Sequence, residues 1–120
     1  MNREYDLEER LISNATQLIR LVNELPNNVS GKYLTNQITR AAISSALNYG
    51  EAQGAESRRD FIHKMRVTLK ELRELQVALK IVRRNNLVDS SIVDSPLDET
   101  SQLVAIFTTS IATSVSNKGR

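Results

Sequence analysis

Residues 37–61, QITRAAISSALNYGEAQGAESRRDF, decide how this chain folds, because they join the end of one helix to the start of the next. The first half is rich in alanine and serine, and such small side chains let the backbone of another helix come close. Gln53 and Gly54 then stop the helix, since glycine is common just after a helix end. Ser57, with Asp60 three residues later, is a weak capping box. The stretch therefore predicts two successive helices joined by a short turn, the first of them tightly packed.

Outward from this turn, apolar residues recur at helical spacing along most of the chain. Downstream, gaps of four and three residues define a heptad seam that only Thr68 interrupts. Upstream, the same rhythm runs from Leu7 to the residue before Pro26, which ends it. Ser95 followed by Pro96 is a typical helix start. The sequence predicts one all-α domain over residues 1–120, an antiparallel up-and-down four-helix bundle with helices near 6–25, 31–52, 58–85 and 96–116, and a connection over 85–95.

Composition limits the class of protein. The 120 residues, with 40% hydrophobic and 25% charged content, suit one globular domain with one core. No apolar run approaches the roughly 20 residues that a membrane span needs, and the charged N-terminus is unlike a signal peptide. Cysteine is absent, which excludes disulfides, thiolate metal sites and a cysteine nucleophile. We therefore expect a cytoplasmic protein without membrane contact.

Residues suited to catalysis or metal binding are sparse. The single histidine, His63, has no glutamate three residues before it, so the Glu-x-x-His pairs of di-iron bundles are missing. The chain has no glycine-rich phosphate loop either. Since nothing in the residue pattern supports catalysis, we expect a non-enzymatic protein with no cofactor, no metal ion and no catalytic residues.

A polar face on the helix predicted at 31–52 is the first candidate site. Gaps of three and four residues place its members on one side of the helix: Gln37, Arg40, Ser44, Asn48 and Glu51. One interpretation is a binding groove. The other is a network between helices or subunits, in which Arg40 pairs with Glu71 or Glu74. We favour the network, because a helix rich in small residues is suited to be covered.

The second candidate site is a row of cations on the helix predicted at 58–85. Residues 53–84 contain nine Lys or Arg and four Asp or Glu, so the positive charge of a chain with net charge +2 is concentrated there. The cations that we name the basic stripe lie opposite the apolar seam, with His63 beside them: Arg59, Arg66, Lys70, Arg73, Lys80 and Arg84. Two interpretations stay open, a solvated helix face and a track for phosphate groups. No aromatic residue interrupts the stripe, so base stacking on it is not expected.

Two helices look suited to be covered on a second side. From Thr100 to Asn117 the last predicted helix carries no charge, whereas an isolated surface helix would normally carry Glu and Lys. We therefore expect another subunit to cover it. The helix predicted at 31–52 combines its small residues with apolar positions expected to make contacts: Tyr33, Leu34, Ile38, Ala41 and Leu47. A central place in the bundle or a subunit contact would explain why more than one face of this helix is suited to packing.

A recurring pattern, roughly Q-x-x-R-A-A-x-S, N-x-x-E, G-x-x-S-x-x-D-F and a later E-L, runs through the chain. Its matches are Gln37, Arg40, Ala41, Ala42, Ser44, Asn48, Glu51, Gly54, Ser57, Asp60, Phe61, Glu74 and Leu75. The pattern resembles that of the four-helix-bundle proteins known as the 23S rRNA intervening-sequence, or S23, family. The chain departs from it at Ser45 and Tyr49, where isoleucine is usual, and at Ala52, where glycine is usual.

The resemblance implies partners. Members of the family form ring-like homo-oligomers, pentamers among them, so it implies self-association. Some relatives are encoded inside intervening sequences of large-subunit rRNA genes. Others resemble the basic pentameric accessory proteins of diversity-generating retroelements, which partner a reverse transcriptase and its RNA. We predict a protein that binds RNA or DNA through the basic stripe. The alternative is a protein–protein scaffold, such as an accessory subunit to a nucleic-acid enzyme, and salt-sensitive RNA binding would separate the two.

Overall fold

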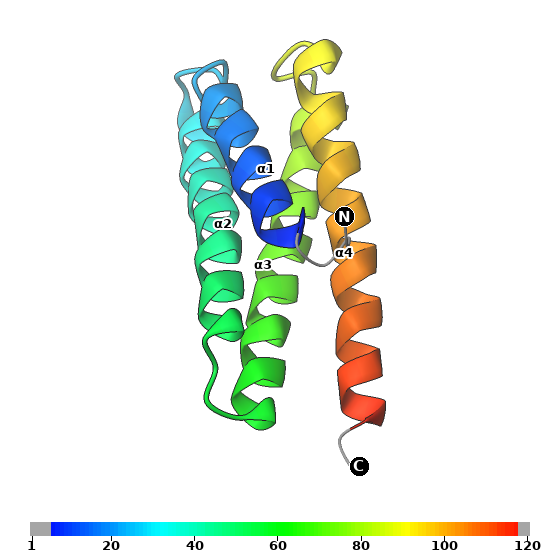
Figure 1. The fold of residues 1–120 in the computed structure, drawn as a ribbon. Coiled ribbons are helices and arrows are strands. Elements are labelled where there is room, and N and C mark those ends of the chain that lie inside the picture. The colour runs from blue at the N-terminus through cyan, green and yellow to red at the C-terminus, as the bar shows by residue number, and fades with distance from the viewer. Residues whose placement is uncertain (1–5, 118–120) are drawn as a thin grey trace.

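The computed structural model describes residues 6–117, and these form four helices without a β-strand. The helices are α1 (Asp6–Val22), α2 (Val29–Gln53), α3 (Arg58–Arg84) and α4 (Ser90–Ser116). Successive helices run in opposite directions, with the α1–α2 and α3–α4 turns at one end and the α2–α3 turn at the other (Figure 1). The all-α four-helix bundle predicted from the sequence is confirmed.

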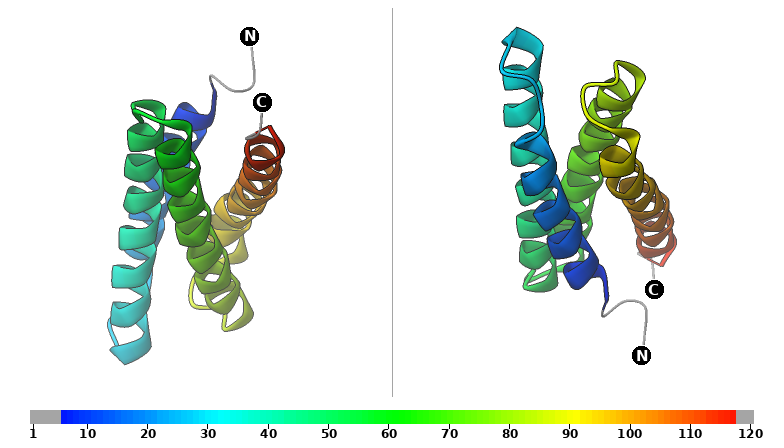
Figure 2. Two further views of the ribbon diagram at one scale, coloured as in Figure 1. Left: turned by 90° about the horizontal axis from the view of Figure 1, so that it is seen from below. Right: turned by 90° about the horizontal axis from the view of Figure 1, so that it is seen from above.

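The helices surround a mainly aliphatic core. The α2–α3 contact is the most extensive, followed by α3–α4 and α1–α2, and the α1–α4 contact is the least. The end-on views place α3 between α2 and α4 (Figure 2). Leu72, Leu79 and Phe107 are wholly buried, and the ring of Tyr49 meets Phe107 edge-on with 5.5 Å between centroids. Thr68, the interruption of the heptad seam, is buried with its hydroxyl donating to the carbonyl of Lys64 at 2.9 Å. Thr68 therefore packs inside the seam, and its hydroxyl group has a hydrogen-bond partner there.

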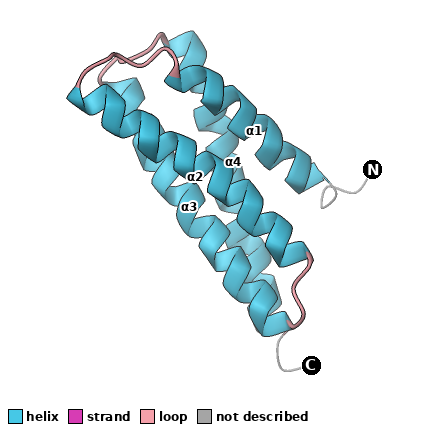
Figure 3. Ribbon diagram, turned by 90° about the vertical axis from the view of Figure 1, so that its left-hand side faces the viewer, coloured by secondary structure: helices cyan, strands magenta, loops and turns pink. Residues whose placement is uncertain are grey.

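α1 is the short member of the bundle. It has 17 residues, whereas α4 has 27. At about 1.5 Å per residue, α1 is roughly 15 Å shorter than α4. α1 therefore begins part of the way along its neighbours, and α2, α3 and α4 all extend beyond it (Figures 1 and 3).

Side-chain caps begin three of the helices. Asn28 caps α2 and Ser57 caps α3, each accepting a hydrogen bond from the backbone N–H three residues later, at 2.9 and 3.0 Å. The Ser57 cap is the one that the sequence predicts. Asp89 caps α4 by accepting from the backbone N–H of Ser91 at 2.9 Å. This hydrogen bond, with a second from the Ser91 side chain, holds the pKa of Asp89 below its usual range.

Two helix boundaries differ from the expected ones by three residues or more, and the others agree to within two. α1 ends at Val22, and residues 23–25 belong to the turn. α4 begins at Ser90, six residues before the expected start at 96, so Pro96 lies inside the helix and the connection shrinks to residues 85–89. Proline lacks the N–H that would bond to the preceding turn. Burial of Pro96 and Val93 in the core offsets this loss, and packing therefore overrides the start signal at Pro96.

Gly31 supplies a stability test, because the α1–α2 turn leaves no room for a side chain there. A Cβ atom at Gly31 would lie 1.8 Å from the carbonyl oxygen of Pro26. We expect Gly31→Ala to lower the free energy of unfolding by about 1–3 kcal/mol, as measured by urea denaturation. Gly50 is the matched control, since a Cβ there meets nothing within 4 Å. Gly50→Ala should stabilise the helix by about 0.5–1 kcal/mol. Similar effects of the two substitutions would contradict the packing seen at Gly31.

Candidate nucleic-acid interface

The charged side chains of α3 are sorted by sign around the helix. Its three acidic residues, Asp60, Glu71 and Glu74, recur at helical spacing on the side that faces α2. Glu71 and Glu74 both reach Arg40 of α2. The basic stripe lies on the outer side of α3, and all its members are exposed: Arg59, Arg66, Lys70, Arg73, Lys80 and Arg84.

Other cations of α3 pair with neighbouring helices. Lys64 lies 2.6 Å from Glu51 of α2, and this hydrogen bond raises the pKa of Lys64. Arg83 lies 2.6 Å from Asp94 of α4. By contrast, no acidic side chain within residues 7–117 forms an ion pair with a member of the basic stripe. The cations at the edges of α3 are therefore neutralised by the fold, and those of the stripe are left to solvent or to a ligand.

Repulsion within the basic stripe bears on its two interpretations. A solvated helix face usually mixes signs, because opposite charges three or four residues apart stabilise a helix. The stripe instead places like charges at these spacings, for example at Arg66, Lys70 and Arg73. Each such pair destabilises a helix by roughly 0.2–0.5 kcal/mol. A bound polyanion would remove the repulsion, so the arrangement favours a phosphate track over a merely solvated face.

The polar face of α2 joins α2 to α3 within one chain. Arg40 donates to Glu71 at 3.2 Å and to Gln37 at 3.0 Å, and it lies 3.6 Å from Glu74. Glu71 is only 7% exposed, so Arg40 compensates a buried charge. These are the ion pairs that the network interpretation predicts, and they lie between helices of one subunit.

The remaining members of this polar face form separate local groups. Asn48 donates to the carbonyl and the hydroxyl oxygen of Ser44, one turn earlier on α2, at 2.9 and 3.1 Å. Glu51 pairs with Lys64, a residue that the sequence analysis did not include in the set. The five residues therefore share one face of α2, as their spacing indicates, but they do not make one continuous network.

A polar seam between α1 and α4 is not predictable from the helix patterns of the sequence. Arg10 donates twice to Glu99, at 2.8 Å each, and once to Gln102 at 3.1 Å. Deeper in the seam, the buried Asn14 donates to the hydroxyl of Thr100 at 2.9 Å. The only signal in the sequence was Asn14 itself, which occupies a position of the apolar stripe of α1. Hydrogen bonds therefore specify the α1–α4 contact beside its apolar packing, in which Leu11 shares a core cluster with Leu103 and Phe107.

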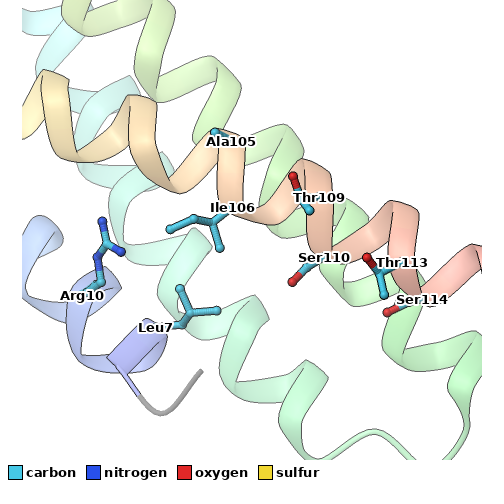
Figure 4. Close-up of a pocket in the computed structure, with 8 residues that line it drawn as sticks. All are labelled: Leu7, Arg10, Ala105, Ile106, Thr109, Ser110, Thr113 and Ser114. Atoms are coloured by element: carbon cyan, nitrogen blue, oxygen red, sulfur yellow. The ribbon is translucent and has the colours of Figure 1, made fainter. Parts of the chain in front are cut away.

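Beyond this seam, α1 and α4 enclose a groove of about 520 Å³. Leu7 and Ile106 point toward each other across it, and Ser110 and Ser114 follow along α4 (Figure 4). The groove includes no charged residue from α4, and Arg10 of α1 is engaged by Glu99. The complete lining is Leu7, Arg10, Ala105, Ile106, Thr109, Ser110, Thr113 and Ser114. The uncharged stretch of α4 thus forms one wall of an open groove, in which the charge of Arg10 is paired with Glu99.

Two further observations limit the chemistry of residues 6–117. This part of the chain holds no cluster of three or more His, Asp or Glu side chains that could bind a metal ion. None of its helices combines the length and the hydropathy of a transmembrane span.

Four antiparallel helices, a cationic face on α3 and a polar α2–α3 network define a small four-helix-bundle protein with a basic surface. The family profile described as 23S rRNA-intervening sequence protein matches residues 3–109, and the chain belongs to this family. The chain is also similar to a crystal structure of a protein of unknown function from the S23 ribosomal protein family of Bacteroides thetaiotaomicron. The TM-score is 0.75 at 26% identity, over 87% of this chain and 96% of the other. No curated protein matches the chain. The resemblance that the sequence indicates is therefore confirmed.

The Arg40 network generates a test of its structural role. We expect Arg40→Ala to lower the free energy of unfolding by about 1–3 kcal/mol, because the buried Glu71 loses its cation. Lys64→Ala is the control, since it breaks an ion pair whose acid, Glu51, is 57% exposed. That change should cost clearly less stability than Arg40→Ala, because the ion pair is exposed to solvent. Urea denaturation and light scattering would measure stability and mass. An Arg40→Ala protein with unchanged stability and mass would rule out the structural role.

Proposed function

We propose that this protein binds the phosphate backbone of RNA or DNA through the basic stripe and catalyses no reaction. The observation that carries the proposal is the row of exposed cations without acidic partners in residues 6–117. Contacts from Lys and Arg to phosphates supply most of the affinity of sequence-independent binding. Such binding needs charge at suitable spacing and no catalytic group.

The length of the basic stripe supports the proposal. From Arg59 to Arg84 the stripe extends about 37 Å along α3, close to the roughly 34–36 Å of one duplex turn. If all six cations contacted phosphates of a duplex, affinity would fall by about a thousand-fold between 50 and 200 mM salt. The name of the family, which refers to intervening sequences of 23S rRNA, supports RNA as the first ligand to test.

The test is a titration of labelled RNA and duplex DNA at 50 and 200 mM salt with wild-type protein and an Arg66→Glu/Arg73→Glu variant. We expect binding that weakens steeply with salt, and a loss of about a hundred-fold in the variant at low salt. An Arg20→Glu/Lys32→Glu protein is the matched control. It has the same net charge, and both substituted cations are exposed residues of α1 and α2.

Two results would contradict the proposal. One is the absence of binding by wild-type protein at low salt. The other is an equal loss in the two double variants, which would mean that net charge alone matters and that the basic stripe has no special part. Light scattering on each variant would show that its mass is unchanged.

We further propose that a second copy of the chain covers the groove between α1 and α4. The groove is open and its α4 wall is uncharged, so a charged partner would lose hydration there without gaining an ion pair. The ring-like homo-oligomers, pentamers among them, that the family resemblance implies would provide such a cover. An unrelated protein seated in the groove would instead fit the scaffold alternative.

Self-association can be tested with Ala105→Arg, which adds a cation to the wall of the groove. We expect the wild-type protein to be an oligomer at micromolar concentration and the variant to have a lower mass in light scattering, because the new charge would be buried unpaired. Gln17→Arg, at an exposed position of α1 outside the groove, should leave the mass unchanged. A monomeric wild-type protein, or an Ala105→Arg variant of unchanged mass, would refute this interface.

A further inference from the structure

We infer that the C-terminal end of the basic stripe is a site for single-stranded nucleic acid, where an unpaired base stacks on Tyr33 and neighbouring phosphates bind Lys80 and Arg84. The inference rests on the proposed function and names its ligand class. No aromatic residue interrupts the stripe itself, and the ring of this site comes instead from α2.

The register of α2 against α3 places Tyr33 beside the stripe. Tyr33 stands one heptad before Arg40, so both side chains leave the same face of α2. Ile81 stands one heptad after Glu74 and shares its face of α3. The two helices are antiparallel and packed side by side (Figure 1). The Arg40–Glu74 ion pair, at 3.6 Å, shows which residues of the two helices lie opposite each other. Because the helices are antiparallel, one heptad back along α2 corresponds to one heptad forward along α3. Tyr33 therefore lies level with Ile81.

Burial of the adjoining residues supports this register. Leu34 and Val82, the chain neighbours of Tyr33 and Ile81, belong to the same buried core cluster. The backbone on both sides of the seam is thus held by the core. Tyr33 itself is 65% exposed and Ile81 is 45% exposed. An aromatic ring therefore stands in solvent on a well-anchored helix.

The cations of this site lie next to these apolar residues on α3. Lys80 and Arg84 flank Ile81, and they also line a hollow of about 640 Å³ at the α3–α4 turn with Asn86 and Ser90. Because Tyr33 lies on the α2 side of α3 and the hollow lies on the α4 side, the cations stand between them. A strand crossing this end of α3 would meet an aromatic ring, then two cations, and then hydrogen-bonding groups.

This combination selects for a single strand. Proteins hold single-stranded nucleic acids by stacking bases on aromatic rings beside cations that follow the backbone. In a duplex the bases are stacked and paired, so none is available to Tyr33. An apolar patch made for a protein partner would not need the neighbouring charges, and Lys80 and Arg84 therefore favour a nucleic acid.

The test compares a labelled single-stranded RNA of about twelve nucleotides, within the usual site sizes, with the duplex of the same sequence. We expect Tyr33→Ala to weaken single-strand binding about ten-fold and to leave duplex binding unchanged, whereas Tyr33→Phe retains both. Leu47→Ala is the matched control. Leu47 is 61% exposed and stands two heptads from Tyr33 on the same face of α2, level with Val67 in the first half of α3. It should have no effect on either ligand.

The outcomes separate this inference from the function on which it rests. If Tyr33→Ala binds single strands as wild type does while Arg66→Glu/Arg73→Glu does not, the stacking site is refuted and the phosphate track stands. If wild-type protein binds neither ligand, both are refuted. A changed oligomeric mass of Tyr33→Ala with unchanged RNA binding would assign the patch to a protein contact and overturn the inference.

Discussion

The close packing of α2 against α3 is the constraint on which the rest of the structure depends. It is the most extensive contact in the bundle, and it is made by small residues of α2, since Ala41, Ala42 and Ser45 are all buried. Small side chains allow the two backbones to approach, and a long polar side chain such as Glu71 then becomes buried at the seam. The charge of Glu71 has to be compensated, and Arg40 compensates it from α2.

The same packing accounts for the asymmetry of charge around α3. On both sides of α3, a cation of this helix pairs with an acidic residue of the neighbouring helix. Lys64 pairs with Glu51 of α2, and Arg83 pairs with Asp94 of α4. The acidic residues of α3 itself face α2. No acidic side chain of residues 7–117 forms an ion pair with a cation on the outer face of α3, so these cations stay unpaired. A chain with a net charge of only +2 can thus present a strongly positive surface on one element.

Because α1 is short, it covers only part of α4, and the two parts of α4 differ in their side chains. Along the part of α4 that α1 reaches, polar side chains specify the contact, as in the Arg10–Glu99 ion pair and the Asn14–Thr100 hydrogen bond. Beyond α1, no other helix of residues 6–117 covers this side of α4, and the groove opens. The sequence of α4 follows this division, because it is charged at Glu99 and uncharged from Thr100 to Asn117. Solvent exposure alone would favour charged residues in the uncovered half, so the absence of charge there is the observation behind the proposed self-association.

What the sequence could predict depends on whether a feature is local to one helix. The heptad seam predicted the bounds of α3 to within one residue. The place of Arg40 on the polar face of α2 led to the prediction that it pairs with Glu71 or Glu74. The helix start predicted at Pro96 was wrong, because burial of the preceding turn in the core is a tertiary effect that no local sequence signal reveals. Tyr33 was expected to pack by its periodicity and is instead exposed. Its place beside the basic stripe depends on the register of two antiparallel helices, and that register becomes visible only once the Arg40–Glu74 contact is known. The spacing of residues along one helix is therefore enough to predict the cations of the surface. The aromatic residue of the proposed site belongs to the neighbouring helix, and only the packing of the two helices places it there.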